Sequence, residues 1–133
     1  MEKLDAIVAL CCNVSFDAGE NRLGYEEPEE YVEDWFDNVN EPVDQDVMAS
    51  VKARNNVVRL WIYPRTPVGH YRAIGATYSA VIDQLLPAVL EDIDYTIASG
   101  EPAKWWVDAN YTVEAYQLLG GTKVDELKAC LSK

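Results

Sequence analysis

Charge alternates in sign along this chain in long blocks, and this alternation limits how the chain can fold. Residues 17–46 carry twelve acids against a single base, whereas residues 47–82 carry five bases and no acid. From Asp83 to Glu101 there are again five acids and no base. Blocks of like charge repel one another, and blocks of opposite charge can pair within a subunit or between subunits. The fold must therefore separate the acidic blocks or set them against the basic one.

The size and composition predict a single folded domain over residues 1–133. The chain is 49% hydrophobic and carries a formal net charge of −12, which is typical of a globular protein and unfavourable for binding nucleic acid or an anionic membrane. It has no run of eighteen apolar residues, so we expect no transmembrane helix. The apolar stretch over residues 6–12 is preceded by Glu2 and Asp5 rather than by a basic region, so we expect no signal peptide.

Three cysteines, Cys11, Cys12 and Cys130, form an odd set without CxxC spacing. We interpret them as reduced, buried thiols in a cytoplasmic protein. Adjacent cysteines make poor tetrahedral ligands, so a zinc site that combines them with His70 is not expected. His70 is the only histidine, and no GxSxG motif, calcium loop or glycine-rich phosphate cradle is present. We therefore predict no catalytic residue, no metal and no cofactor, and a protein that is not an enzyme.

The acidic block contains the clearest amphipathic helix of the chain. Pro28 suits its first position, and carboxylates near a helix N-terminus interact favourably with the helix dipole. On a helical wheel, one arc holds the acids Glu29, Glu30, Glu33, Asp34 and Asp37. The opposite arc holds the apolar residues Tyr31, Val32, Trp35, Phe36 and Val39. Repulsion among the acids costs on the order of 1 kcal/mol, which burial of Trp35 and Phe36 exceeds. We expect the helix to dock through its aromatics with the carboxylates outward.

Two further segments leave an alternative open. Residues 4–14 predict a short helix, with a buried strand as the second interpretation, and a loop is expected from Asp17. Residues 43–54 favour a helix by their valine spacing, but they also alternate as a strand would, and Asn55-Asn56 could form a hairpin turn. The run over residues 57–63 is β-branched and aromatic and predicts a strand.

The second half of the chain predicts one long helix and several strands. Thr66-Pro67 is expected to cap a helix over residues 67–86, which Pro87 ends or kinks. That helix would carry a face of small residues, Ala73, Ala76 and Ala80. Strands are expected at 94–98, 105–107 and 111–119, and a last helix after Thr122. Together these elements predict an α+β fold, an antiparallel sheet with helices packed on one face.

The order of elements over residues 56–119 resembles the tail-terminator and tail-completion proteins of tailed bacteriophages. The likeness rests on the strand Val57–Tyr63, the Pro-Arg-Thr-Pro turn, the long helix, and further strands ending in Tyr-Thr-Val-Glu-Ala-Tyr-Gln-Leu-Leu. It implies a structural subunit of a homo-oligomeric ring, found in the host cytoplasm and in the virion. Acidic and basic blocks would then meet across a head-to-tail interface.

A small acidic inhibitor is the alternative hypothesis. Carboxylates on a rigid helix can stand in for phosphates and occupy a basic groove on a host protein, as phage anti-defence proteins do. Both hypotheses act through protein partners without membrane or direct nucleic-acid binding. The residues expected to contact a partner are Glu29, Glu30, Glu33, Asp34, Asp37, Lys52, Arg54, Arg59, Arg65, Arg72, Trp105 and Trp106.

Overall fold

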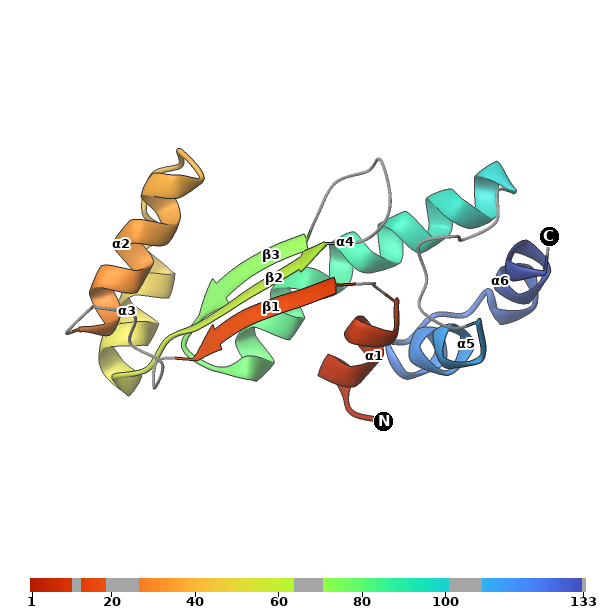
Figure 1. The fold of residues 1–133 in the computed structure, drawn as a ribbon, viewed down its shortest axis with the longest axis horizontal. Coiled ribbons are helices and arrows are strands. Elements are labelled where there is room, and N and C mark those ends of the chain that lie inside the picture. Colours follow the sequence, from red (N-terminus) through yellow and green to blue (C-terminus); the bar gives the residue numbers. More distant parts are fainter. Residues whose placement is uncertain (11–12, 19–26, 64–70, 101–108, 133) are drawn as a thin grey trace.

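A computed structural model describes residues 1–10, 13–18, 27–63, 71–100 and 109–132, and Figure 1 shows their arrangement. The elements in chain order are α1 (Lys3–Leu10), β1 (Asn13–Ala18), α2 (Pro28–Asn38), α3 (Gln45–Arg54), β2 (Val58–Tyr63), β3 (Tyr71–Gly75), α4 (Tyr78–Ser99), α5 (Ala109–Leu118) and α6 (Val124–Leu131). Helices predominate, and the strands form one antiparallel sheet in the order β1-β2-β3. The expected α+β class with an antiparallel sheet is confirmed, but helices pack on both faces of the sheet rather than on one.

The main hydrophobic core lies between one face of the sheet and α4, and α1, α5 and α6 complete it (Figure 1). Leu60 and Ile62 of β2 point into this core, and Ala73 of β3 lies directly opposite Leu60. Val81 and Leu85 of α4 pack against them. Side chains on a strand alternate between faces, so the intervening residues of β2 and β3 belong to the other face of the sheet.

A second hydrophobic core lies on that other face, where α2 and α3 pack as a pair. Its buried residues are Tyr31, Val32, Trp35, Phe36, Met48, Val51, Val57, Ile74 and Ala76. Ile74 comes from β3, and Trp61 of β2 packs against the cluster. The second core fixes α2 and α3 at one end of the sheet, away from α5 and α6 (Figure 1).

The predicted helix over residues 67–86 is wrong where it can be compared with the structure. Residues 71–75 form β3, and Tyr71 is buried, Arg72 exposed and Ala73 buried, as expected beside a paired strand. α4 begins only at Tyr78, because Thr77 is its N-cap. The Thr77 Oγ1 accepts a hydrogen bond from the Ala80 N–H at 3.1 Å. Thr66 and Pro67 lie outside the described residues.

The proposed face of small residues is not an open helix surface. Ala73 and Ala76 are 4% and 1% exposed and belong to the two cores. Only Ala80 lies on a helix, where it is half-buried. The alanines therefore fill the space between strand and helix within the chain.

The strand expected at residues 94–98 is also wrong, because α4 continues through Pro87 to Ser99. Proline inside a helix costs about 3 kcal/mol. Buried residues recur every four positions on both sides of it: Val81, Leu85, Val89 and Ile93. Burying each such side chain contributes roughly 1.5–3 kcal/mol, and Pro87 lies on the exposed side. The apolar stripe therefore outweighs the proline.

The strand expected at 111–119 is a helix, α5. Thr112, Ala115, Tyr116 and Leu119 are all 5% exposed or less, and their spacing of three and four residues is helical. The strand expected at 105–107 lies outside the described residues. A last helix, α6, is confirmed, although its N-cap is Lys123 rather than Thr122.

Two glycines connect α5 to α6. Gly120 has φ of +92°, which favours glycine. At Gly121 a Cβ would lie 2.2 Å from the Tyr116 ring. The Tyr116 hydroxyl also accepts a hydrogen bond from the Lys123 N–H at 3.2 Å. The ring of Tyr116 thus packs directly against the backbone at Gly121, where any larger side chain would clash with it.

The N-terminal segment combines both interpretations of residues 4–14. α1 ends at Leu10, and β1 then pairs with β2 from Asn13 to Ala18. Asp17 and Ala18, expected in a loop, belong to this strand. The pairing with β2 supplies the backbone hydrogen bonds that local sequence could not indicate.

Candidate functional site

The acidic helix predicted from the sequence is α2, and it docks as expected. Trp35 and Phe36 are 7% and 8% exposed, and Val32 is fully buried. The Trp35 ring meets that of Trp61 on β2 edge to face, with centroids 5.3 Å apart. Aromatic pairs in this geometry contribute about 0.5–1.5 kcal/mol beyond the area they bury. α2 is therefore held on the sheet by its apolar arc.

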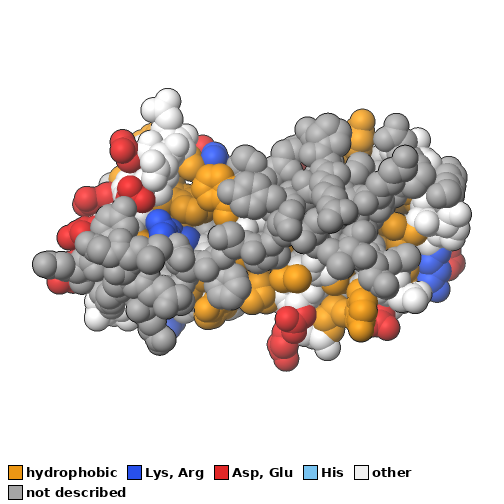
Figure 2. All heavy atoms as spheres, viewed as in Figure 1, with side chains coloured by type: hydrophobic (Ala, Val, Ile, Leu, Met, Phe, Trp, Pro, Cys, Tyr) orange, Lys and Arg blue, Asp and Glu red, His pale blue; other side chains and the backbone are white. Residues whose placement is uncertain are grey.

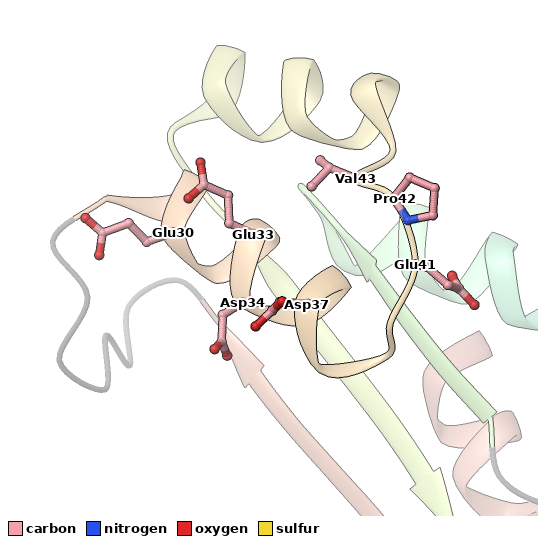
Figure 3. A pocket seen from close by; sticks show the side chains of 7 residues that line it. All are labelled: Glu30, Glu33, Asp34, Asp37, Glu41, Pro42 and Val43. Carbon is pink, nitrogen blue, oxygen red and sulfur yellow. The ribbon is translucent and has the colours of Figure 1, made fainter.

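The carboxylates of α2 differ in how far they are exposed. Glu30, Glu33 and Asp37 are exposed, as predicted, whereas Glu29 and Asp34 are half-buried. Figure 3 shows the side chains of Glu30, Glu33, Asp34 and Asp37 spread along the helix rather than converging on one point. The arrangement is a row of separate negative charges.

An open groove of about 800 Å³ runs along this row (Figure 3). Its lining residues are Glu30, Glu33, Asp34, Asp37, Glu41, Pro42 and Val43. The last three come from the connection between α2 and α3, which the sequence analysis did not assign to the site. The sequence does indicate that α2 ends before Glu41-Pro42, because an asparagine precedes this pair and asparagine favours the left-handed turn that ends a helix.

That turn fixes where Glu41 lies. Asn40 has φ of +57°, and the Glu41 N–H donates to the Phe36 carbonyl at 3.0 Å. Asp44 then caps α3, since its Oδ1 accepts hydrogen bonds from the N–H groups of Asp46 and Val47 at 2.9 and 3.3 Å. These bonds confirm the helical interpretation of residues 43–54 and hold the end of the groove.

Arg59, from the basic block, pairs with the inner side of the acidic face. Its Nη1 lies 3.6 Å from Asp34 Oδ2, and its side chain is 15% exposed. Its guanidinium carbon also lies 4.7 Å from the centre of the Tyr31 ring, which adds a cation–π attraction. Asn38 Nδ2 donates to the same Asp34 oxygen at 3.2 Å. Asp34 is thus committed to contacts within the chain.

Arg72 of β3 makes the second such contact, with Glu41. Its Nη2 lies 3.2 Å from Glu41 Oε1, and the two side chains are 36% and 55% exposed. Opposed charge blocks therefore pair within one subunit at Asp34 and Glu41. Of the five carboxylates that line the groove, two are paired in this way. Among the described residues, no ion pair is found for the other three, Glu30, Glu33 and Asp37.

The remaining residues expected to contact a partner do not join this site. Lys52 and Arg54 are exposed in the last turn of α3, where cations interact favourably with the helix dipole. Arg65, Trp105 and Trp106 lie outside the described residues. Four of the five groove carboxylates and both of their arginine partners were thus predicted from the sequence, whereas Glu41 was not.

The described residues offer no cluster for metal chemistry. Within residues 1–10, 27–63, 71–100 and 110–132, no three His, Cys, Asp or Glu side chains gather closely enough to hold a metal ion. Cys130 is buried, and its Sγ lies 3.5 Å from the Thr96 carbonyl oxygen. Cys11, Cys12 and His70 lie outside the described part of the chain. What the acidic row offers is electrostatic attraction for a cationic surface.

On the face shown in Figure 2, acidic side chains gather over the end formed by α2 and α3. A membrane-crossing helix requires a length and a continuous apolar composition that no helix in the described ranges has. No protein family model, no curated protein and no solved structure matches this chain. The function must therefore be inferred from the geometry of the chain itself.

Proposed function

We propose that this protein is a non-enzymatic binding protein whose acidic groove along α2 docks on a basic surface of a partner protein. The observation that carries the proposal is the row of three exposed carboxylates, Glu30, Glu33 and Asp37, for which no ion pair is found in the described chain. The other two groove carboxylates already bind arginines. The row is therefore the part of the groove that is open to a partner.

The spacing of the acids supports imitation of a phosphate backbone. Residues 29–37 hold five carboxylates, of which Glu29 and Asp34 are half-buried. The open three, Glu30, Glu33 and Asp37, are three and four helical steps apart, about 4.5 and 6 Å along the axis at 1.5 Å per residue. One strand of B-DNA carries a charge about every 3.4 Å along its axis. The open carboxylates of α2 are thus between one and two phosphate spacings apart, which a basic groove built for nucleic acid can meet. This spacing favours the acidic-inhibitor class.

The rigidity of the scaffold supports the same proposal. α2 is anchored through Trp35 and Phe36, which are buried in the second core. The turn at Asn40 and the cap at Asp44 hold the other end of the groove. A preorganised surface loses little conformational entropy on binding. Exposed charges on it therefore contribute more to affinity than charges on a conformationally disordered segment would.

The ring-forming assembly hypothesis has less support. Its interface would pair the acidic and basic blocks of neighbouring subunits, but Arg59 is mostly covered and already binds Asp34 of its own chain. The strand expected at 111–119 is α5, so the order of elements behind the resemblance to tail-terminator proteins is not that of the structure. We place the inhibitor in the cytoplasm, where thiols such as that of Cys130 stay reduced.

The test is binding of a hexa-arginine peptide, as a defined basic probe, by titration calorimetry at low salt. The variant carries Glu30→Gln, Glu33→Gln and Asp37→Asn. Its matched control carries Asp83→Asn, Glu91→Gln and Glu114→Gln, which remove the same charge from exposed positions on α4 and α5. We expect about tenfold weaker binding for the groove variant, about 0.5 kcal/mol for each charge, and a smaller loss for the control. Equal losses in the two variants would contradict the proposal.

A further inference from the structure

Two arginines contact the acidic groove, and they are held very differently. Arg59 is 15% exposed and lies against the Tyr31 ring as well as Asp34. Arg72 is 36% exposed, and its partner Glu41 is 55% exposed. Ion pairs between exposed side chains are weak and are screened by salt. The contact between Arg72 and Glu41 is therefore the one that a competing cation can replace.

The place of this pair in the groove gives it a consequence for binding. Glu41 lies at the α3 end of the groove, and Arg72 reaches it from β3, 31 residues further along the chain. A guanidinium supplied by a different element thus already occupies one carboxylate of the site. Its positive charge also lowers the attraction of the groove for any basic partner.

We propose that Arg72 is an autoinhibitory contact: its guanidinium occupies Glu41 as an internal competitor, and an arginine of the basic partner displaces it on docking. This inference rests on the proposed function of the groove. It adds that the partner presents a guanidinium at the α3 end of the groove, and that the intact Arg72–Glu41 pair limits the affinity of the free protein for such a partner.

Removal of the competitor tests the inference. We expect Arg72→Gln to bind hexa-arginine about three- to fivefold more tightly than the wild type at about 0.1 M salt. Arg54→Gln, the matched control, removes the same charge from the last turn of α3. That position is nine helical steps, about 13.5 Å along the axis, from Gln45 at the start of α3, which is beyond the Debye length of about 10 Å at 0.1 M salt. We expect the control to change the affinity less than twofold.

A double-mutant cycle separates competition at Glu41 from a general effect of charge. In a Glu41→Gln background, Arg72→Gln should lose most of its effect, because the carboxylate that it releases is absent. Thermal unfolding checks that each variant is folded, and Arg72→Met serves as a second variant with an apolar stem. Equal effects of Arg72→Gln and Arg54→Gln, or an undiminished effect in the Glu41→Gln background, would overturn the inference.

Failure of this inference is distinguishable from failure of the proposed function. If neutralising Glu30, Glu33 and Asp37 weakens binding but Arg72→Gln behaves like Arg54→Gln, the groove binds its partner without an internal competitor. If neutralising the three acids has no more effect than the matched control, the groove is not the binding site. In that case both proposals fail.

Discussion

Replacement of Arg59 by methionine should destabilise this protein even though an arginine on a sheet surface is ordinarily replaceable. Methionine keeps an apolar stem of similar length and removes the charge. The guanidinium lies 3.6 Å from Asp34 and 4.7 Å from the Tyr31 ring centre, and the side chain is 15% exposed. Exposed ion pairs contribute about 0–1 kcal/mol and breaking buried ones costs about 3–5 kcal/mol. Because the Asp34 side chain is 34% exposed, we assign the pair about 1 kcal/mol, the upper end of the range for exposed pairs.

The cation–π contact adds to this loss. Such contacts contribute about 0.5–1 kcal/mol when exposed and about 2 kcal/mol when desolvated, so about 1 kcal/mol fits a guanidinium that is mostly covered. We therefore expect Arg59→Met to lower the free energy of unfolding by about 2 kcal/mol. Urea unfolding followed by far-UV circular dichroism measures it, as a midpoint about 1 M lower for a typical m-value.

Arg54→Met is the control for Arg59→Met, because Arg54 is exposed on α3, and we expect a change within about 0.5 kcal/mol. A loss at Arg59 no larger than that at Arg54 would refute the assignment of Arg59 to an internal contact. Reversing the charge of Arg59 is therefore a poor test of the ring-forming assembly hypothesis. Arg59→Glu would place a second negative charge beside Asp34, so a loss of self-association in that variant would report a weakened fold rather than a lost interface.

Three further predictions follow from the packing. Trp35→Ala should lower the free energy of unfolding in urea by about 3–5 kcal/mol, because Trp35 is 7% exposed. Its control, Tyr95→Ala at a 63% exposed site, should lower it by less than about 1 kcal/mol. Similar losses in the two variants would contradict the packing of the second core. Gly121→Ala should destabilise by about 1–3 kcal/mol, since its Cβ would lie 2.2 Å from the Tyr116 ring, and an unchanged melting temperature would contradict that contact. Native mass measurement should find a monomer at low and at high salt, because Arg59 and Arg72 pair within the chain; a ring at low salt would favour the assembly hypothesis instead.

The sequence predicted best the elements whose signals are local. α2 could be predicted because its two arcs do not overlap on the helical wheel and Pro28 marks its start. β2 could be predicted because β-branched and aromatic residues are rare in such a run outside strands. In α3 the valine spacing fitted two structures, and the cap formed by Asp44 distinguishes them only once its hydrogen bonds are seen.

The errors lie where the outcome depends on distant parts of the chain. β3 is a strand because it pairs with β2, and α4 passes Pro87 because its apolar stripe packs into the main core. The periodicity of Thr112, Ala115 and Tyr116 in α5 was readable as helical, but the aromatic and β-branched residues there favoured a strand. Intrinsic strand propensity is weaker than burial.

The candidate site, too, was predictable in part from the sequence and in part only from the tertiary structure. The charge blocks indicated that acids and bases would pair, and the wheel indicated which acids would face outward. Neither could identify the partners, because Arg59 reaches Asp34 and Arg72 reaches Glu41 only through the sheet register and the packing of α2 on it. The division of the groove into paired and open carboxylates is a property of the tertiary structure.

The most direct test of the acidic groove as the binding site is a map of where a basic ligand binds. Two-dimensional amide NMR of the wild-type protein, titrated with hexa-arginine at low salt, reports this for each residue. The proposed function predicts shifts concentrated in α2 and its connection to α3, residues 28–43, where the groove lies. Shifts spread equally over the exposed acids of α4 and α5, such as Asp83, Glu91 and Glu114, would contradict it.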